Sequence, residues 1–418
     1  MSRPAARLGL LANHLSKQTT QRFSTNEASA NAMSNQKPHP LTMIPGPIEF
    51  DDKVLEAMSH YAEAHTAAPF VQTFGNTLKL TRQLFLSKDA NAQPFIIAGS
   101  GSLGWDIVAS NFVESGENVL VLNTGYFSSA FADCLQVYGA KVDQVTAPIG
   151  DRPTLEQVEA ALKQKFYKVI TITHVDTSTG VLSDIKAISQ LVHKVSPDTL
   201  VVVDGVCSVA SEEIKFDEWG LDYVLTASQK AIGAPPGLSV SYASARAIKT
   251  VENRKTPVSS YFASLPRWIP VMKAYESGKP AYFATPAVQN VYALHEALSQ
   301  FATSDESVQK RIADHKATSD KVKDAVANLG LKTVAVSREN SAHGMTAVYL
   351  PQGVVNTDLL PALLKKGVTL AGGIHKEIAT KYFRIGHMGV SATRPQLGHV
   401  DTVLKHLSET LNELGYKA

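Results

Sequence analysis

The sequence predicts an α/β protein with a large domain, built on a mainly parallel sheet flanked by helices, and a smaller α+β domain at the C-terminus. Its 418 residues exceed one ordinary core, since domains run to about 100–200 residues each. Short, nearly continuous apolar runs separated by helical or turn segments are typical of parallel strands covered on both faces. These runs are residues 95–98, 119–122, 169–173, 200–203 and 223–226.

The order of the patterns predicts four parts: a tail at residues 1–40, an N-terminal arm at 41–65, the large domain at 66–290 and the small domain at 291–418. From about Ala287 a long helical pattern runs to the region of Leu329. Strands are expected around residues 332–336, 345–349 and 382–385, and a closing helix at 397–414.

The first forty residues differ from the rest of the chain. They contain Arg3, Arg7, Lys17 and Arg22, but no acid before Glu27. This composition is typical of a mitochondrial transit peptide, which here would end near residue 23 and direct the protein to the matrix. The alternative is a disordered tail without significance. A start at Met33 or Met43 would give an untargeted form, cytosolic or peroxisomal.

Composition excludes several partners. The net charge of +2, without a run of basic residues, gives no field for nucleic acid or anionic lipid. Two cysteines, Cys134 and Cys207, make neither a disulfide framework nor a four-ligand metal site, and no metal is expected. No apolar stretch reaches the ~18 residues of a membrane span.

A glycine loop follows the first predicted strand. Gly99, Gly101 and Gly104 read as G-x-G-x-x-G, but the next strand ends in Asn123 rather than in the acid that a dinucleotide requires. Such a loop at a helix N-terminus still suits a phosphate. A plain tight turn is an equal interpretation.

Two charged residues follow later strands. Asp204 ends an apolar strand, where a helix N-cap or salt bridge competes with the interpretation that it pairs with a protonated pyridine nitrogen. Lys230 lies among small residues and turn formers just after the next strand. Most lysines are solvated surface charges, whereas a desolvated one has a lowered pKa and becomes a nucleophile toward carbonyls.

The run Ser228-Gln229-Lys230-Ala-Ile-Gly-Ala-Pro-Pro-Gly237 resembles that of class V aminotransferases, in the branch of alanine–glyoxylate and serine–pyruvate aminotransferases. The resemblance extends from Pro45 nearly to the C-terminus. It implies fold type I of the pyridoxal-phosphate enzymes and this cofactor.

The resemblance also implies roles for residues around the cofactor ring. Lys230 would bind the cofactor covalently and move the substrate's proton, and Asp204 would pair with the pyridine nitrogen. Val206 and Tyr126 would pack on the two ring faces, with Thr177 near the ring hydroxyl.

Further implied contacts concern the phosphate and the substrate. The phosphate contacts would be Ser100, Gly101, Ser102 and Gln229. Tyr282 and Thr285 resemble a pair that reaches the phosphate of the neighbouring subunit, which implies a homodimer with shared active sites. Arg384 would bind the substrate carboxylate through a bidentate pair, although a structural ion pair is an equal interpretation of the residue alone.

The resemblance implies transamination of small amino and 2-oxo acids, most specifically from L-alanine to glyoxylate, and the single substrate-binding arginine favours such small monocarboxylates. Serine–pyruvate or serine–glyoxylate transamination is the alternative, and Ser102, where several relatives carry His, leaves this preference open. A cysteine desulfurase is disfavoured because no cysteine follows Cys207. The remaining alternatives are another class V lyase, a dehydrogenase and an inactive scaffold.

Overall fold

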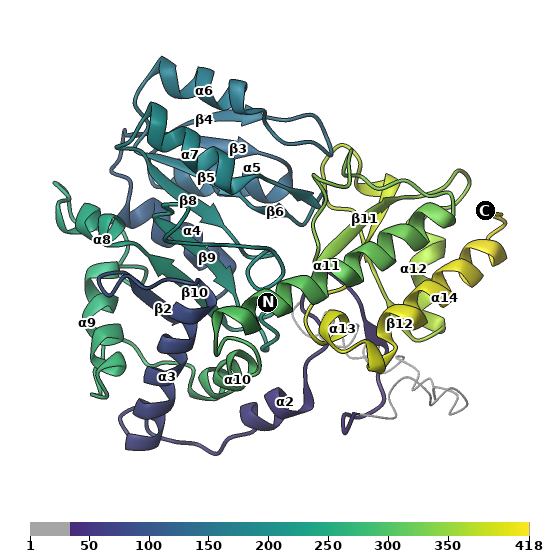
Figure 1. Ribbon diagram of the computed structural model, residues 1–418, viewed down its shortest axis with the longest axis horizontal. Helices are drawn as coiled ribbons and strands as arrows, with labels where there is room; N and C mark the ends of the chain where they lie inside the picture. Colours follow the sequence, from purple (N-terminus) through teal and green to yellow (C-terminus); the bar gives the residue numbers. More distant parts are fainter. Residues whose placement is uncertain (1–33, 418) are drawn as a thin grey trace, which may run out of the picture. The chain divides into compact units, whose positions relative to one another are not determined.

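A seven-stranded sheet forms the centre of the large domain in the computed structural model, which describes residues 34–417 (Figure 1). The strand order is β2-β10-β9-β8-β5-β3-β4, and all neighbours are parallel except β10, which is antiparallel to β2 and β9. The predicted mainly parallel sheet is thus confirmed. Its strands are β2 (Gln93–Ala98), β3 (Asn118–Asn123), β4 (Lys141–Thr146), β5 (Val169–Thr173), β8 (Leu200–Asp204), β9 (Tyr223–Ala227) and β10 (Leu238–Ala243).

Each of the five predicted apolar runs lies in one of these strands. Every residue of β5, β8 and β9 is buried, because helices cover both faces of the central sheet. The prediction missed β4 and β10. A short hairpin, β6 (Val175–Asp176) with β7 (Val181–Leu182), follows β5 and carries polar residues of the site region.

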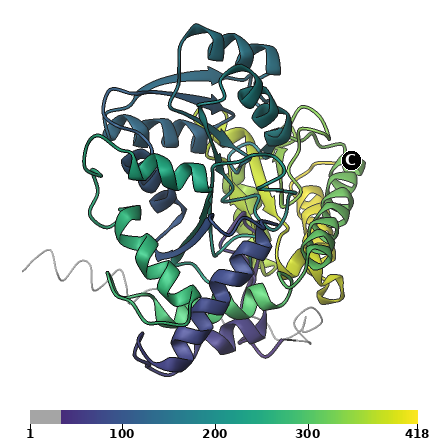
Figure 2. The same cartoon turned by 60° about the vertical axis from the view of Figure 1, so that its left-hand side comes forward.

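Helices between the strands complete the large domain. They are α4 (Gly101–Asn111), α5 (Tyr126–Val137), α6 (Leu155–Gln164), α7 (Ile185–Val195), α8 (Ala245–Glu252) and α9 (Leu265–Glu276). Three more are α2 (Asp52–Met58), α3 (Ala68–Leu84) and α10 (Val288–Ser299). In both views α3 lies beside α9 and α10, although about 200 residues separate these helices in the sequence (Figure 2).

The small domain has its own three-stranded sheet, in the order β11-β14-β13. Its strands are β11 (Met345–Tyr349), β13 (Ala371–Gly372) and β14 (Tyr382–Gly386), and its helices are α11 (Asp305–Asn328), α12 (Asn356–Lys365), α13 (Val390–Thr393) and α14 (His399–Glu413). Two 3₁₀ turns, η1 (Ala379–Lys381) and η2 (Pro395–Leu397), complete the list.

Two predicted elements of this region need correction. The long helical pattern is two helices, α10 and α11, because Ser304 breaks the run and caps α11 through its hydroxyl. Residues 332–336 form no strand. Thr333 makes only an isolated bridge with Val348, and the N–H of Val336 bonds to the carbonyl oxygen of Gly150 instead, so the pairing with β11 does not extend into a strand although Val334 is buried.

Buried apolar side chains form two groups, one around the seven-stranded sheet and one in the small domain between β11, β14, α12 and α14. The N-terminal arm joins the second group through β1 (Leu41–Thr42), which pairs with β12 (Val368–Thr369). The predicted domain boundaries stay a prediction, and the predicted transit peptide lies outside the described residues. Within residues 34–417, no helix combines the length and the apolar character that crossing a membrane requires.

Candidate active site

A pocket opens where loops leave the carboxyl ends of β2, β5, β8 and β9, the usual place for a ligand in such a sheet. Seven of the predicted site residues line it: Ser100, Gly101, Ser102, Thr177, Asp204, Val206 and Gln229, and Lys230 joins them as the eighth. The pocket therefore brings together residues from positions 100 to 230 of the chain. Five further residues line it that the prediction did not include: Trp105, Phe127, Thr173, Val175 and Cys207.

Asp204 is the only carboxylate among the described residues that line the pocket. Its Oδ1 accepts a hydrogen bond from the backbone N–H of Val206 at 3.0 Å, and its Oδ2 accepts one from Nε1 of Trp105 at 2.8 Å. Burial raises the pKa of Asp204 to about 6, against the opposing effect of these two donors. The carboxylate neither caps a helix nor forms a salt bridge with the described residues, so it is available to a cationic ligand group.

Lys230 follows β9 in a turn whose small residues leave its amine at the pocket. Burial is the main cause that lowers the pKa of this amine. Cys207 opposes this effect, Arg384 lowers the pKa further, and Asp204 has the smallest, opposing effect. Its Nζ donates a hydrogen bond to the carbonyl oxygen of Pro45 in the N-terminal arm. A lysine with a lowered pKa has the neutral amine that attacks carbonyl carbon.

The helix N-terminus at the other end of the pocket fits the phosphate of pyridoxal phosphate. Ser100 is the N-cap of α4, and its side chain makes no capping bond. The N–H of Leu103 bonds to the carbonyl oxygen of Ser100, whereas the N–H groups of Gly101 and Ser102 make no hydrogen bond with the described residues. A Cβ on Gly101 would lie 2.7 Å from Cγ2 of Val206, which means that only glycine allows this close approach. The buried Oε1 of Gln229 has no hydrogen-bond partner within residues 34–417, so the amide is free to turn toward a ligand.

Arg384 lies in β14 of the small domain, with its guanidinium next to the hairpin of the large domain. Its Nε donates to the carbonyl oxygen of Gly372 at 2.8 Å and its Nη1 to that of Thr177 at 3.1 Å. It has no carboxylate partner within 4.0 Å among the described residues, which argues against the structural ion pair that the sequence left open. Burial lowers the pKa of this guanidinium. A partly desolvated arginine held by two carbonyls can still bind a carboxylate.

Four predicted contacts do not line the pocket, namely Arg384, Tyr126, Tyr282 and Thr285. The side chain of Tyr126 is 42% exposed, whereas its neighbour Phe127 forms part of the pocket wall. Tyr282 is 64% exposed and Thr285 is also exposed. Exposure of Tyr282 and Thr285 is what a contact with a second subunit would require. Their roles and the predicted ring stacking of Tyr126 stay predictions.

Trp105 and Phe127 are the two missed residues with aromatic rings. Trp105 lies four residues after Gly101, on the same face of α4, and this spacing was a usable signal. The choice between Tyr126 and Phe127 had no such signal, because both begin α5. Within residues 34–417, no three His, Cys, Asp or Glu side chains gather in a way that could hold a metal ion.

Known proteins resemble the chain over nearly all of its described length. The family profile "Aminotransferase class-V" matches residues 45–398. Alanine–glyoxylate aminotransferase 1 of Saccharomyces cerevisiae is 50% identical over 368 residues, which cover 86% of this chain and 94% of the yeast protein. Serine–glyoxylate aminotransferase of Arabidopsis thaliana is 29% identical, over 83% of this chain and 84% of the plant protein.

A solved structure has the same fold. Alanine–glyoxylate aminotransferase from Nostoc sp. superimposes with a TM-score of 0.82 at 27% identity, covering 90% of this chain and 96% of that one. Pyridoxal phosphate is the cofactor of this family, and the pocket has the residues to hold it. The chain belongs to the class V aminotransferases.

Proposed function

We propose that this protein transfers the amino group of L-alanine to glyoxylate and releases pyruvate and glycine. The observation that carries the proposal is the pocket itself, where Lys230, Asp204 and the nearby Arg384 are all free of ion pairs with the described residues. The likeness to the yeast enzyme supports the choice of donor and acceptor.

Each of the three residues has a distinct task in this reaction. Pyridoxal phosphate, when bound, supplies an electron-withdrawing ring that makes the proton on the substrate's α-carbon acidic. Lys230, whose pKa is lowered by burial, would accept that proton and deliver it to a carbon of the cofactor. Asp204 holds positive charge at the ring nitrogen, and Arg384 orients the substrate through its carboxylate.

The lining of the pocket supports a small substrate with one carboxylate. Lys230 is its only cation among the described lining residues, so the side-chain carboxylate of a dicarboxylic acid would find no second arginine there. Serine is the alternative donor. The hydroxyls of Ser102 and Thr177 at the pocket wall could bind the hydroxyl of serine, and the plant relative supports this alternative.

The test is an absorbance spectrum of the purified protein, recorded before and after L-alanine and again after glyoxylate. We expect the band of the lysine-bound cofactor to disappear with alanine and return with glyoxylate, with pyruvate and glycine formed in equal amounts. Lys230→Ala is the control and should bind cofactor without turnover. A band that responds to serine and not to alanine would change the donor, and absence of any bound cofactor would overturn the proposal.

We infer that the protein acts as a homodimer with shared active sites. Support comes from exposed aromatic side chains around the predicted phosphate contacts, where Tyr61, Tyr261 and Tyr282 are 69%, 69% and 64% exposed. Such a concentration of exposed aromatic surface is typical of an interface.

Mixing two inactive variants tests the dimer. One variant carries Lys230→Ala and the other carries Tyr282→Ala with Thr285→Ala. If the sites are shared, mixed dimers contain one intact site, and activity should reappear after the subunits are exchanged. A monomeric mass by light scattering, or no recovery after verified exchange, would contradict this inference.

We also propose that residues 1–23 direct the protein to the mitochondrial matrix. The basic, acid-poor composition supports this proposal. A fluorescent protein fused to residues 1–40 should enter mitochondria, and a fusion in which Arg3, Arg7 and Arg22 are replaced by glutamine should remain in the cytosol. Equal distribution of the two fusions would contradict the proposal.

A further inference from the structure

The indole of Trp105 holds one side of the carboxylate that is proposed to face the cofactor ring. Its Nε1 donates to Oδ2 of Asp204 at 2.8 Å, and the residue lines the pocket. The backbone N–H of Val206 donates to the other oxygen at 3.0 Å. Each oxygen thus has one fixed donor, and an ionised carboxylate has roughly four acceptor positions, so positions remain for a donor from the pocket.

These two donors act on the charge of Asp204 as well as on its orientation. Asp204 is buried, and burial favours the protonated form of a carboxyl group. Hydrogen bonds to the ionised form oppose this effect, and the bonds from Val206 and Trp105 do so here. Without the indole, Oδ2 would be a buried acceptor with no partner on the protein, which costs free energy when the group is charged.

Neighbouring aromatic rings set the orientation of the indole. Trp105 stacks on the buried Phe131 of α5, with ring centroids 5.5 Å apart and an interplanar angle of 14°. Phe127 lies at 6.5 Å on the same helix. The N–H group of Trp105 therefore has little freedom to turn away from Asp204.

The position of Trp105 in α4 connects the two ends of the pocket. Gly101 begins this helix at the predicted phosphate site, and Trp105 follows one turn later on the same face. Helix α4 therefore presents its free N–H groups to the phosphate end of the pocket and the indole N–H of Trp105 to the end that holds Asp204.

We propose that Trp105 is a positioning residue that keeps Asp204 ionised and aligned with the pyridine nitrogen of the cofactor. The proposal rests on the proposed function, since it requires pyridoxal phosphate in this pocket. One part of the affinity for the cofactor depends on its ring nitrogen. By this proposal the indole N–H of Trp105 contributes to that part. Trp105 would act through Asp204 and would not itself take part in proton transfer.

The test compares the binding of two cofactors to the wild type and three variants by equilibrium dialysis. The first cofactor is pyridoxal phosphate and the second is its carbocyclic analogue, in which a C–H group replaces the ring nitrogen. Trp105→Phe should bind pyridoxal phosphate about 10- to 100-fold more weakly than the wild type, the range for a lost hydrogen bond to a charged group. The analogue has no nitrogen to pair with Asp204, so the variant should bind it within about threefold of the wild type.

Trp219→Phe is the matched control. Its Nε1 is buried and has no hydrogen-bond partner in the described part of the chain. This variant therefore loses an indole without losing such a bond, and both affinities should match the wild type. Trp105→His restores a ring N–H on a five-membered ring and should recover part of the affinity for pyridoxal phosphate. It also decides the question if Trp105→Phe does not fold.

Two results would overturn the inference. One is a Trp105→Phe protein that binds pyridoxal phosphate as tightly as Trp219→Phe does. The other is an equal loss of affinity for both cofactors, which would make Trp105 a packing residue only. Failure of the wild type to bind pyridoxal phosphate would instead disprove the proposed function, so the two failures are distinct.

Discussion

Gly46 allows the N-terminal arm to approach Lys230 closely. Its φ is +90°, and a Cβ there would lie 2.5 Å from Cδ and 2.8 Å from Nζ of the lysine. The lysine amine donates to the carbonyl of the preceding residue, Pro45. This glycine therefore leaves room for the amine beside the backbone of the arm.

We expect Gly46→Ala to lower kcat/KM at least tenfold, because the methyl group would occupy the space of the lysine side chain. Gly353→Ala is the matched control, since this glycine has a similar φ of +84° but no atom within 4 Å of an added Cβ. The control should show the backbone strain alone, as a loss of stability with normal kinetics. Equal kinetics for the two variants would contradict crowding at Lys230.

The pKa of Asp204 predicts a pH dependence of cofactor binding. Burial raises this pKa to about 6 from an ordinary value of 3.8, so the group is ionised only above about pH 6 in the cofactor-free protein. Pairing with a cationic ring requires the ionised form. Affinity for pyridoxal phosphate should therefore fall as the pH drops through 6.

Titration of binding between pH 5 and 8 checks this expectation. Asp204→Asn should bind more weakly and lose this pH dependence. The raised pKa of Asp204 also affects the stability of the protein. Because the folded protein binds the proton more tightly than the unfolded chain, the stabilising contribution of Asp204 is lost as the pH rises from about 4 through 6. A flat binding profile in the wild type would contradict the assignment.

Among single residues, the sequence predicted the charged residues of the site better than the uncharged residues beside them. Lys230 and Asp204 stand directly after apolar strands, and parallel strands bring such positions to one edge of a sheet. The spacing from Gly101 could have placed Trp105 on the pocket face of its helix, but its bond to Asp204 could not be predicted, because this partner is 99 residues away and the contact depends on how α4 packs. Packing between distant segments leaves no local pattern in the chain.

Helix α4 is the element on which both ends of the pocket depend. A Cβ on Gly104 would lie 2.7 Å from Cβ of Leu225 in β9, and the base of a side chain cannot move aside without its backbone. Gly101 makes a similar close contact one turn earlier. The two glycines therefore set the distance between the helix and the sheet.

Gly104→Ala should push α4 away from the sheet. We expect a loss of about 1–3 kcal/mol in the free energy of unfolding, as for overpacked cores, and weaker binding of pyridoxal phosphate. Adding Leu225→Gly, which removes the Cβ that the new methyl group would meet, should restore cofactor affinity while stability stays low, because a buried leucine is lost. Urea unfolding and dialysis separate the two effects, and a double variant that binds no better than Gly104→Ala would contradict this account.

The elements themselves were predictable where the chain is apolar and buried on both faces. Strands β5, β8 and β9 are of this kind, and each matches its predicted run. Strand β4 was missed because it lies at the edge of the sheet and has only partly buried or exposed residues. Strand β10 alternates Leu, Ser, Val and Ser, and its burial depends on neighbours on both sides.

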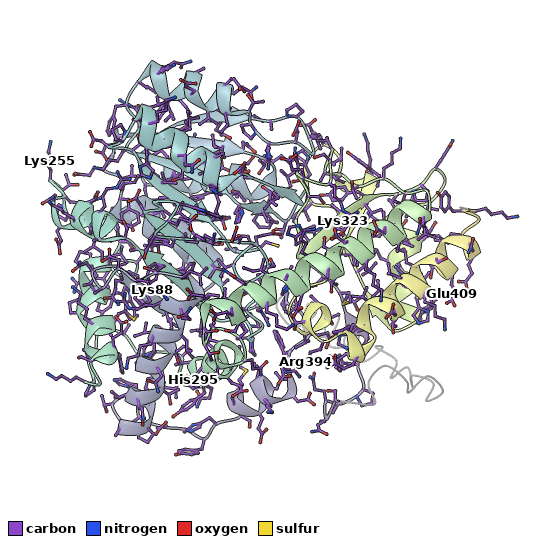
Figure 3. All side chains as sticks on the ribbon, viewed as in Figure 1. Lys88, Lys255, His295, Lys323, Arg394 and Glu409 are labelled. Carbon is purple, nitrogen blue, oxygen red and sulfur yellow. The ribbon has the colours of Figure 1, made fainter. Side chains whose placement is uncertain are left out.

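The whole molecule has several buried basic groups that no acid neutralises directly. Burial lowers the pKa of His174 to about 4 and those of His315 and His387 to about 3. Lys323 on α11, which Figure 3 labels, donates to the carbonyl of Ala342 at 2.6 Å, and burial lowers its pKa to about 8. These groups are neutral or held by carbonyls in the folded protein.

The three histidines predict destabilisation in mild acid. Their folded pKa values lie below the unfolded value of 6.5, so the unfolded chain binds protons first as the pH falls below 6.5. Each should remove about 2 kcal/mol from the free energy of unfolding between pH 7 and 5. The opposite effect of Asp204 offsets only part of this loss.

Urea midpoints of the cofactor-free protein at pH 7, 6 and 5 test the prediction. The midpoint should fall steadily, and the fall should be smaller for His387→Asn, which removes one of the three protons. An unchanged midpoint would show that these histidines remain neutral in the unfolded chain as well, or that they charge without unfolding the protein.

The pairing of β10 with β2, which comes much earlier in the chain, has a consequence for protein synthesis. Among the described strands, β2 pairs only with β10, and about 140 residues separate the two partners in the chain. At about 5–20 residues per second, a ribosome needs on the order of ten seconds to deliver the partner of β2. Until then an apolar strand has a bare edge, the kind of surface that chaperones bind and that joins nascent chains to one another. The growing polypeptide should therefore depend on chaperones most strongly between the emergence of Ala98 and that of Ala243 from the exit tunnel.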